Sequence, residues 1–203
     1  MAKGLDVAED CTDQIGCLTD GGFEFVCRYY NTNNPSKNLT LAEAQALSAA
    51  GITIVVVWEN GFPTKASYFS NAKGVSDATA ALKLASESIG QPEGSAIYFA
   101  VDYDATVEDV SGPISQYFQG VKSVFDAAEK QYAIGVYSSG ATCKSVLDAG
   151  LVTFTWLSQS TGFRGSKTFT AFNIKQGPEA KICGMDADGD DAPDVAACGG
   201  FVL

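Results

Sequence analysis

Two acidic residues end an apolar run at residues 96–106, which read AIYFAVDYDAT. On an extended chain Asp102 and Asp104 share parity, so both side chains can point to the same side. Neighbouring carboxylates differ in proton affinity, so that one remains ionised while the other holds its proton closer to neutral pH. This division predicts glycosidic bond cleavage, in which one acid protonates the leaving oxygen and another stabilises positive charge or activates water. The alternative is a strand end followed by a helix that Asp caps.

Histidine is absent from the whole chain of 203 residues. Its absence excludes Ser-His-Asp triads, Cys-His pairs and HExxH metalloprotease sites. If the protein is an enzyme, its proton transfers are therefore expected to use carboxylates, with tyrosine in support.

Short β-rich runs alternate with helical patterns through most of the chain, and the first five or six of these runs are separated by helices. This alternation predicts a parallel sheet covered on both faces, which eight strands close into a (β/α)8 barrel. The spacers between the last three runs are too short for long helices. We therefore expect one α/β domain over residues 1–203, a small and irregular TIM-like barrel whose final helices are short or missing; an open doubly wound sheet is the alternative. The predicted strands are 3–8, 23–30, 52–59, 95–102, 133–139, 153–159, 168–176 and 181–188.

Almost every predicted strand ends in a polar residue, at the face where barrels of this class hold their reactive groups. Tyrosine and tryptophan offer flat faces to sugar rings, although core packing is the competing interpretation for Tyr29, Tyr103, Tyr137, Trp58 and Trp156. Glutamine and arginine can form hydrogen bonds with the hydroxyl groups of sugars. In strand order the residues at these ends are Asp6, Arg28 with Tyr29, Glu59, Asp102 with Asp104, Tyr137, Gln159, Gln176, and Asp186 with Asp188.

The formal net charge of −11 limits the kinds of molecule that the protein is expected to bind. Nucleic acids and anionic membranes both reward lysine and arginine, so neither is expected as a partner. No apolar run approaches the roughly 20 residues of a membrane span, and the start, MAKGLDVAED, lacks the apolar region of a signal peptide.

Six cysteines lie at spacings that do not include CxxC, which argues against a structural zinc site and permits up to three disulfides. Several lie in polar, glycine-rich stretches, which favours an oxidising, extracellular setting. The glycine and aspartate cluster near 184–194 is interpreted as a loop, and within it DADGDDAPD at 186–194 partly resembles an EF-hand. Its sixth position is Asp191 where that loop needs glycine, and its twelfth is Ala197 in place of glutamate, so no metal site is expected.

Several segments together resemble a known family: GLDVAE, FVCRYY, LTLAEAQALSAAGITIVVVWE, AIYFAVDYDA, IGVYSSG and a late KQG…MDAD. They resemble the glycoside-hydrolase-like domain family of secreted bacterial and fungal proteins, which is itself similar to the family 25 muramidases. The resemblance implies that Asp6 matches an acid after the first strand and Asp186 a late acid. It implies that Asp102 supports reaction through the substrate's acetamido group. Asp104 stands where those muramidases carry the glutamate that is the general acid, and is one methylene shorter.

These observations lead to three hypotheses. The first is a secreted, monomeric, cofactor-free glycoside hydrolase acting on peptidoglycan or a related amino-sugar polymer such as chitin. The second is a non-catalytic carbohydrate-binding module that keeps the groove, and the third is a metal-dependent hydrolase using the acidic ring. For the first, Asp104 is the expected acid and Asp102 the stabilising carboxylate, with Asp6, Glu59 and Asp186 tuning charge or binding sugar. The expected substrate-binding residues are Arg28, Tyr29, Tyr103, Tyr137, Gln159 and Gln176.

Overall fold

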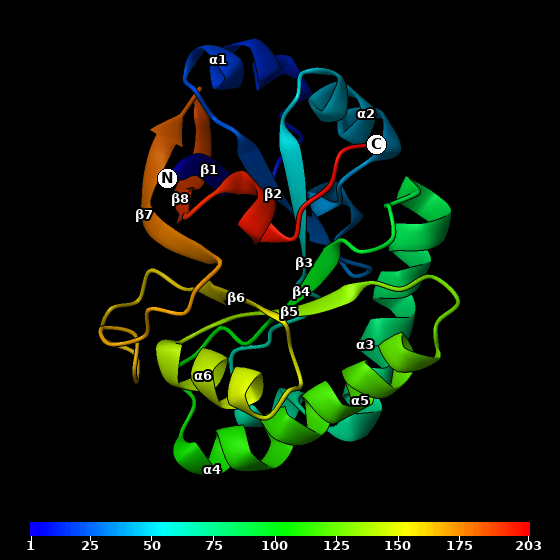
Figure 1. Cartoon of the computed structure of the whole chain (residues 1–203), viewed down its shortest axis with the longest axis vertical. Coiled ribbons are helices and arrows are strands. Elements are labelled where there is room, and N and C mark those ends of the chain that lie inside the picture. The colour runs from blue at the N-terminus through cyan, green and yellow to red at the C-terminus, as the bar shows by residue number, and fades with distance from the viewer.

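The computed structural model describes residues 1–203 and shows one closed barrel of eight strands in sequence order (Figure 1). Strands β1 to β7 are parallel along every adjacent pair. The closed barrel confirms the predicted small TIM-like fold and contradicts the open sheet. The strands are β1 (Ala2–Val7), β2 (Phe25–Tyr30), β3 (Thr53–Trp58), β4 (Ala96–Ala100), β5 (Ala133–Ser138), β6 (Phe154–Leu157), β7 (Ile174–Ile182) and β8 (Met185–Ala192).

The helices are distributed unevenly around the barrel. Figure 1 shows α3, α5 and α6 beside the middle strands, while β7 and β8 lack a helical cover. No α-helix follows α6, which confirms the expectation of short or missing final helices. The α-helices are α1 (Ile15–Asp20), α2 (Leu41–Ala49), α3 (Asn71–Lys83), α4 (Val107–Asp109), α5 (Ser115–Ala127) and α6 (Gly140–Asp148). Leu84–Ile89 and Val110–Ile114 are π-helical, and the 3-10 helices are Thr12–Gln14, Pro35–Lys37, Ala66–Tyr68 and Val195–Cys198.

The last two strands depart from the predicted boundaries. The cluster near 184–194, interpreted as a loop, lies mostly in β8, and β8 is antiparallel to both β7 and β1. Only Cys183 and Gly184 join β7 to β8, and both have left-handed backbone, with φ of 52° and 88°. A two-residue turn of this kind produces a hairpin, because a parallel crossover needs a dozen or more residues.

Apolar side chains fill the barrel interior below the ends of the parallel strands. Phe25, Tyr98 and Trp156 lie in this core. Gly4 and Gly135 leave room for two of these rings, because a Cβ at either position would collide with Phe25 or Tyr98. The rest of the interior core consists of Ala2, Cys27, Val55, Val57, Ala96, Ala100, Ile174, Ala192 and Cys198.

One disulfide joins Cys17 in α1 to Cys183 in the β7–β8 turn. Only one of the three bridges that six cysteines permit is formed, because the other four cysteines, Cys11, Cys27, Cys143 and Cys198, are free and buried. None of the helices has the length and apolarity needed to cross a lipid bilayer.

Candidate active site

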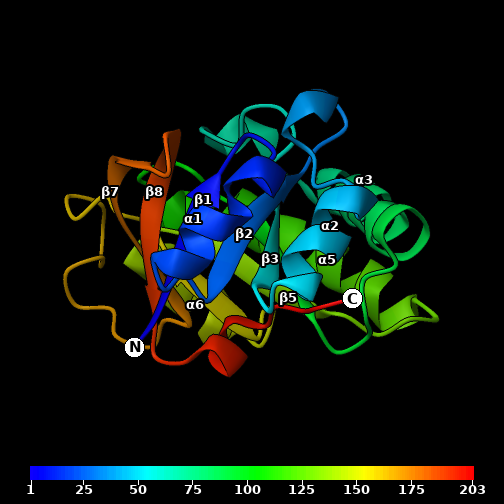
Figure 2. The same cartoon turned by 90° about the horizontal axis from the view of Figure 1, so that it is seen from above.

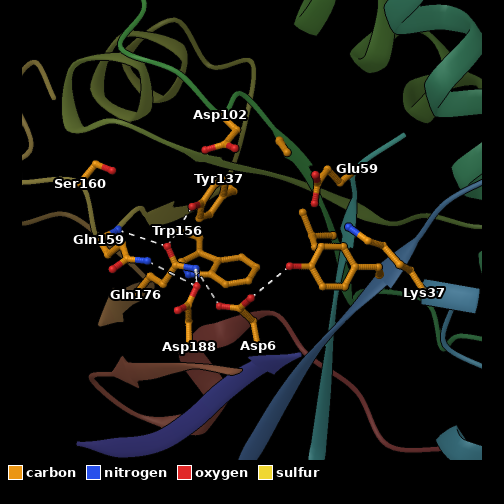
Figure 3. A pocket seen from close by; sticks show the side chains of 13 residues that line it. Asp6, Lys37, Glu59, Asp102, Tyr137, Trp156, Gln159, Ser160, Gln176 and Asp188 are labelled. Atoms are coloured by element: carbon orange, nitrogen blue, oxygen red, sulfur yellow. Dashed lines mark hydrogen bonds between the residues drawn. The ribbon is translucent and has the colours of Figure 1, made fainter. Parts of the chain in front are cut away.

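A cavity of about 360 Å³ opens at the carboxyl ends of the parallel strands (Figure 3). Its size lies within the range of small-molecule sites. Figure 2 shows the connections after β2 and β3 rising beside one another at this end of the barrel. The lining residues are Asp6, Tyr29, Lys37, Val57, Glu59, Ala100, Asp102, Tyr137, Trp156, Gln159, Ser160, Gln176 and Asp188, to which all eight strands or the residues directly after them contribute.

Gln176 of β7 organises one side of the cavity. Its Nε2 donates to Asp6 Oδ2 and to Asp188 Oδ2, at 2.8 Å in each case. Its Oε1 accepts from Tyr137 Oη at 2.8 Å and from the backbone N–H of Gln159 at 3.2 Å. All the hydrogen-bonding capacity of this amide is therefore directed at protein groups, and its orientation is fixed.

Asp6 and Asp188 are directly paired across the antiparallel β1–β8 ladder. Burial, and then the charges of Asp188 and Glu59, raise the pKa of Asp6 to about 7, against the lowering effect of hydrogen bonds from Gln176 and Tyr29. Burial, followed by the charge of Glu179, raises the pKa of Asp188 as well. Like charges in direct cross-strand contact repel, so the charge of Asp188 favours the protonated form of Asp6.

Glu59 and Asp102 lie on the other side of the cavity in Figure 3 and differ from Asp6 in one respect. Neither carboxylate accepts a hydrogen bond from a protein group, although both face the cavity. Burial is the main cause that raises the pKa of both acids; for Glu59 the charge of Lys37 opposes the rise and that of Asp102 adds to it. The cavity thus presents two unengaged carboxylates whose proton affinity is enhanced.

A fifth acid lies beneath the cavity. Asp190 of β8 is 2% exposed and accepts a hydrogen bond from Trp156 Nε1 at 3.0 Å, while its second oxygen has no partner. Burial, followed by the charge of Asp6, raises its pKa well above the usual range. Asp190 therefore favours the protonated form and helps fix the indole ring that lines the cavity.

Asp104, the acid expected from the sequence, does not line the cavity. Its carboxylate accepts from the backbone N–H of Arg164 at 2.7 Å and pairs with the guanidinium at 2.9 Å. These contacts tie the connection after β4 to the β6–β7 connection. Shared parity therefore did not place Asp104 beside Asp102, because the extended backbone of β4 ends at Ala100.

Three further residues selected from the sequence lie outside the cavity. Arg28 is fully buried in an ion pair with Glu43 of α2, at 2.7 Å, and donates to the Val7 carbonyl oxygen at 2.6 Å. Tyr103 stacks on Phe69, with ring centroids 6.2 Å apart. Asp186 is exposed at the hairpin tip, pairs with Lys181 at 2.6 Å, and borders only a neighbouring hollow.

Seven predicted site residues do line the cavity together: Asp6, Tyr29, Glu59, Asp102, Tyr137, Gln159 and Gln176. Asp188 is predicted from the sequence only as a strand-end residue beside Asp186. Lys37, Ser160 and Asp190 are not among the predicted site residues. The alternation of Asp186, Asp188 and Asp190 was the available signal, because alternate residues of a strand share a face. Trp156, considered for sugar stacking, lines the cavity, whereas Trp58 is buried in the core outside the barrel. No group of three or more acidic, cysteine or histidine side chains is arranged to hold a metal ion.

The chain has relatives that are similar in sequence and others that are similar in fold. The chain is 34% identical over 178 residues to the uncharacterized protein YbfG of Bacillus subtilis, covering 81% of this chain and 24% of YbfG. The chain thus spans about a quarter of the length of the curated relatives it matches. The Mycobacterium tuberculosis Tat-secreted protein Rv2525c, solved with L-tartrate, superposes with a TM-score of 0.81 at 21% identity, covering 96% of this chain and 97% of that one.

The muramidase from Acremonium alcalophilum superposes with a TM-score of 0.62 at 11% identity, covering 98% of this chain and 97% of that chain. At these identities both structures establish a shared fold. Residues 16–188 match the family described as the Rv2525c-like, glycoside hydrolase-like domain, which confirms the resemblance found in the sequence. The chain belongs to this Rv2525c-like family of glycoside hydrolase-like domains.

Proposed function

We propose that this domain hydrolyses glycosidic bonds in an amino-sugar polymer, peptidoglycan or a related glycan, through the carboxylates of its cavity. The observation that carries the proposal is the pair Glu59 and Asp102, which face the cavity, have raised pKa values and accept no protein hydrogen bond. Groups reserved in this way are available to a ligand, whereas the carboxylate of Asp104 is engaged by Arg164.

In this reaction Glu59 donates its proton to the glycosidic oxygen while the bond between that oxygen and the anomeric carbon breaks. Asp102 stabilises the positive charge that develops at the carbon. A water molecule adds its oxygen to the carbon and gives a proton to Asp102. The pair returns to its starting state when Asp102 releases this proton to solvent and Glu59 takes one up. Asp6, Gln176 and Tyr137 act as positioning residues that hold one another and Asp188 in place beside the sugar.

We also propose a cellular location and an oligomeric state for the domain. Rv2525c is Tat-secreted, and the Cys17–Cys183 disulfide is typical of an oxidising compartment, so we propose that the domain acts outside the cell. We also propose that it acts as a monomer. The muramidase fold match supports the lysozyme-like substrate class.

The test is release of reducing ends from purified peptidoglycan and chitin between about pH 3 and pH 8. We expect wild-type release to fall by about 100-fold or more in Glu59→Gln and in Asp102→Asn. Asp104→Asn is the matched control, because it neutralises an acid of the same face that lies outside the cavity, and it should retain most activity. Loss of activity in Asp104→Asn alone would return the acid role to the residue predicted from the sequence.

A non-catalytic binding module is the second candidate, and the Asp104–Arg164 ion pair favours it, because the family position of the acid is engaged elsewhere. It predicts that wild type releases no reducing ends from either polymer while still sedimenting with one of them. It also predicts that Glu59→Gln and Asp102→Asn leave this sedimentation largely intact.

A further inference from the structure

The hydrogen-bond donors of the cavity are largely committed to the protein itself. The Tyr29 hydroxyl donates to Asp6 at 3.1 Å and the Tyr137 hydroxyl to Gln176 at 2.8 Å. Both N–H bonds of the Gln176 amide go to Asp6 and Asp188, and the indole N–H of Trp156 goes to Asp190. A ligand in this cavity therefore meets few side chains that can donate to it.

Five acceptor atoms of the cavity, in contrast, are free. Both oxygens of Glu59 and both of Asp102 lack protein partners, and Asp188 Oδ1 is a buried atom with no hydrogen bond. A buried acceptor without a donor costs free energy until a ligand or water supplies one. These atoms come from β8 and from the residues that follow β3 and β4, so unused acceptors face the cavity from two sides.

The charge of the cavity follows the same pattern. Four carboxylates line it, and Lys37 is the one cation. The Lys37 ammonium lies 5.2 Å from the centre of the Tyr29 ring and makes no ion pair within 4.0 Å. A neighbouring hollow of about 180 Å³ shares Asp6, Tyr29 and Asp188 with the cavity and adds Glu179 and Asp186. A bound polymer that extends from the cavity into this hollow remains in an acidic environment.

We propose that the sugar bound in this cavity carries a free ammonium group in place of an acetamido group, so that the substrate class is a glucosamine polymer that is wholly or partly de-N-acetylated. An ammonium supplies three donors and a positive charge, which suits unpaired carboxylates on opposite sides of a cavity. An acetamido carbonyl needs a donor, and the uncommitted donors at hand are Lys37, Ser160 and the Gln159 amide, whose Nε2 makes only one long hydrogen bond, to Asp188 at 3.5 Å. The turnover part of this inference rests on the proposed function, whereas the binding part does not.

The proposal agrees with the attack by water described above and excludes one alternative route. A sugar with a free ammonium has no acetamido oxygen to attack its own anomeric carbon, which is the route that family resemblance implied. Water must then supply the incoming oxygen, while the acid protonates the departing oxygen and the second carboxylate accepts the proton of the water. The bond made to water replaces the bond broken to the leaving sugar, so the step is a balanced hydrolysis.

The test compares two oligomers of equal length, a fully de-N-acetylated glucosamine tetramer and the N-acetylated tetramer. Calorimetric titration at about pH 6 should give a Kd at least about tenfold lower for the de-N-acetylated tetramer, and raising the salt from about 50 mM to about 500 mM should reduce the difference. Equal or tighter binding of the N-acetylated tetramer would overturn the proposal.

A matched pair of variants tests whether the preference for the ammonium sugar comes from the cavity or from a general attraction between an acidic protein and a cation. Asp188→Asn removes one charge inside the cavity, and Asp148→Asn removes one charge on the exposed face of α6. Glu179→Gln is a second variant in the neighbouring hollow, where its exposed side chain makes no hydrogen bond on which folding could depend. Preference for the ammonium sugar should fall in Asp188→Asn and Glu179→Gln and persist in Asp148→Asn; an equal fall in all three would overturn the proposal.

Turnover of the two tetramers distinguishes this inference from the proposed function. Preferred binding of the de-N-acetylated tetramer without cleavage of either would refute hydrolysis and support the inference. Cleavage of the N-acetylated tetramer alone would support hydrolysis and refute the inference.

Discussion

Replacing Asp6 by asparagine should change the way in which stability depends on pH. The side chain is 5% exposed, and burial is the main cause that raises its pKa to about 7. An aspartate in the unfolded chain titrates near pH 4. Because the folded protein binds this proton more tightly than the unfolded chain, the stability from Asp6 is fully present below about pH 4. It is lost as the pH rises through about 7.

The size of the effect follows from the two pKa values. Moving the pKa from 3.8 to about 7 corresponds to about 4 kcal/mol between the two ends of this pH range. Asp188, Glu59 and Asp190 also act on this carboxyl and are still present in Asp6→Asn. The difference in free energy of unfolding between wild type and variant therefore isolates most of the effect of Asp6.

Urea denaturation of wild type and Asp6→Asn at several values between about pH 4 and pH 8.5 measures this difference. The free energy of unfolding of wild type, minus that of the variant, should decrease by about 2–4 kcal/mol as the pH rises. Asp148→Asn, which removes an exposed carboxylate on α6, is the control and should change stability by less than about 1 kcal/mol. A difference that stays constant with pH, or that grows in favour of wild type, would refute the reasoning.

Three further outcomes are expected elsewhere in the molecule. Arg28→Met should cost about 3–5 kcal/mol in urea denaturation, because it leaves the Glu43 carboxylate buried and unpaired; a loss below about 1 kcal/mol would contradict this. Reduction of Cys17–Cys183, which closes a loop of 166 residues, should destabilise the fold by about 4–5 kcal/mol, and an unchanged melting temperature under reductant would count against it. Phe62 is 81% exposed on the connection after β3, so Phe62→Ala should weaken binding of long glycans by about threefold or more while a disaccharide binds as before.

The barrel and most of its polar rim followed from the sequence for a simple reason. Parallel strands that alternate with helices deliver their carboxyl ends to one face, so residues that end separate strands meet there. Asp6, Glu59 and Gln176 are far apart in the sequence and line one cavity. No contact needed to be known in advance, because the topology of the fold brings these residues together.

The failures have equally local causes. Arg28 lies two residues before the end of β2, and alternation along the strand turns its side chain away from the face of Tyr29 and towards Glu43, a partner that strand patterns do not reveal. Asp104 lies after the extended backbone has ended, where parity no longer sets direction. The acidic alternation around Asp188 resembles a loop by composition, and only the two-residue turn at Cys183 indicates that a final antiparallel strand carries it.

The acids of β1 and β8 bear on function because the fold does not need them. Asp6, Asp188 and Asp190 come together on two adjacent strands, and Lys37 is the one cation that lines the cavity above them. Burial of unpaired carboxyl groups costs free energy that apolar side chains of similar size would not cost. A barrel maintained only for its stability would replace such residues, whereas one that binds a cation or moves a proton must retain them. Replacing Asp188 by asparagine, which keeps an oxygen to accept from Gln176 and removes a charge beside Asp6, should therefore stabilise the protein and at the same time weaken its binding of amino sugars. A variant that gained stability and kept its affinity would separate these acids from the function of the cavity.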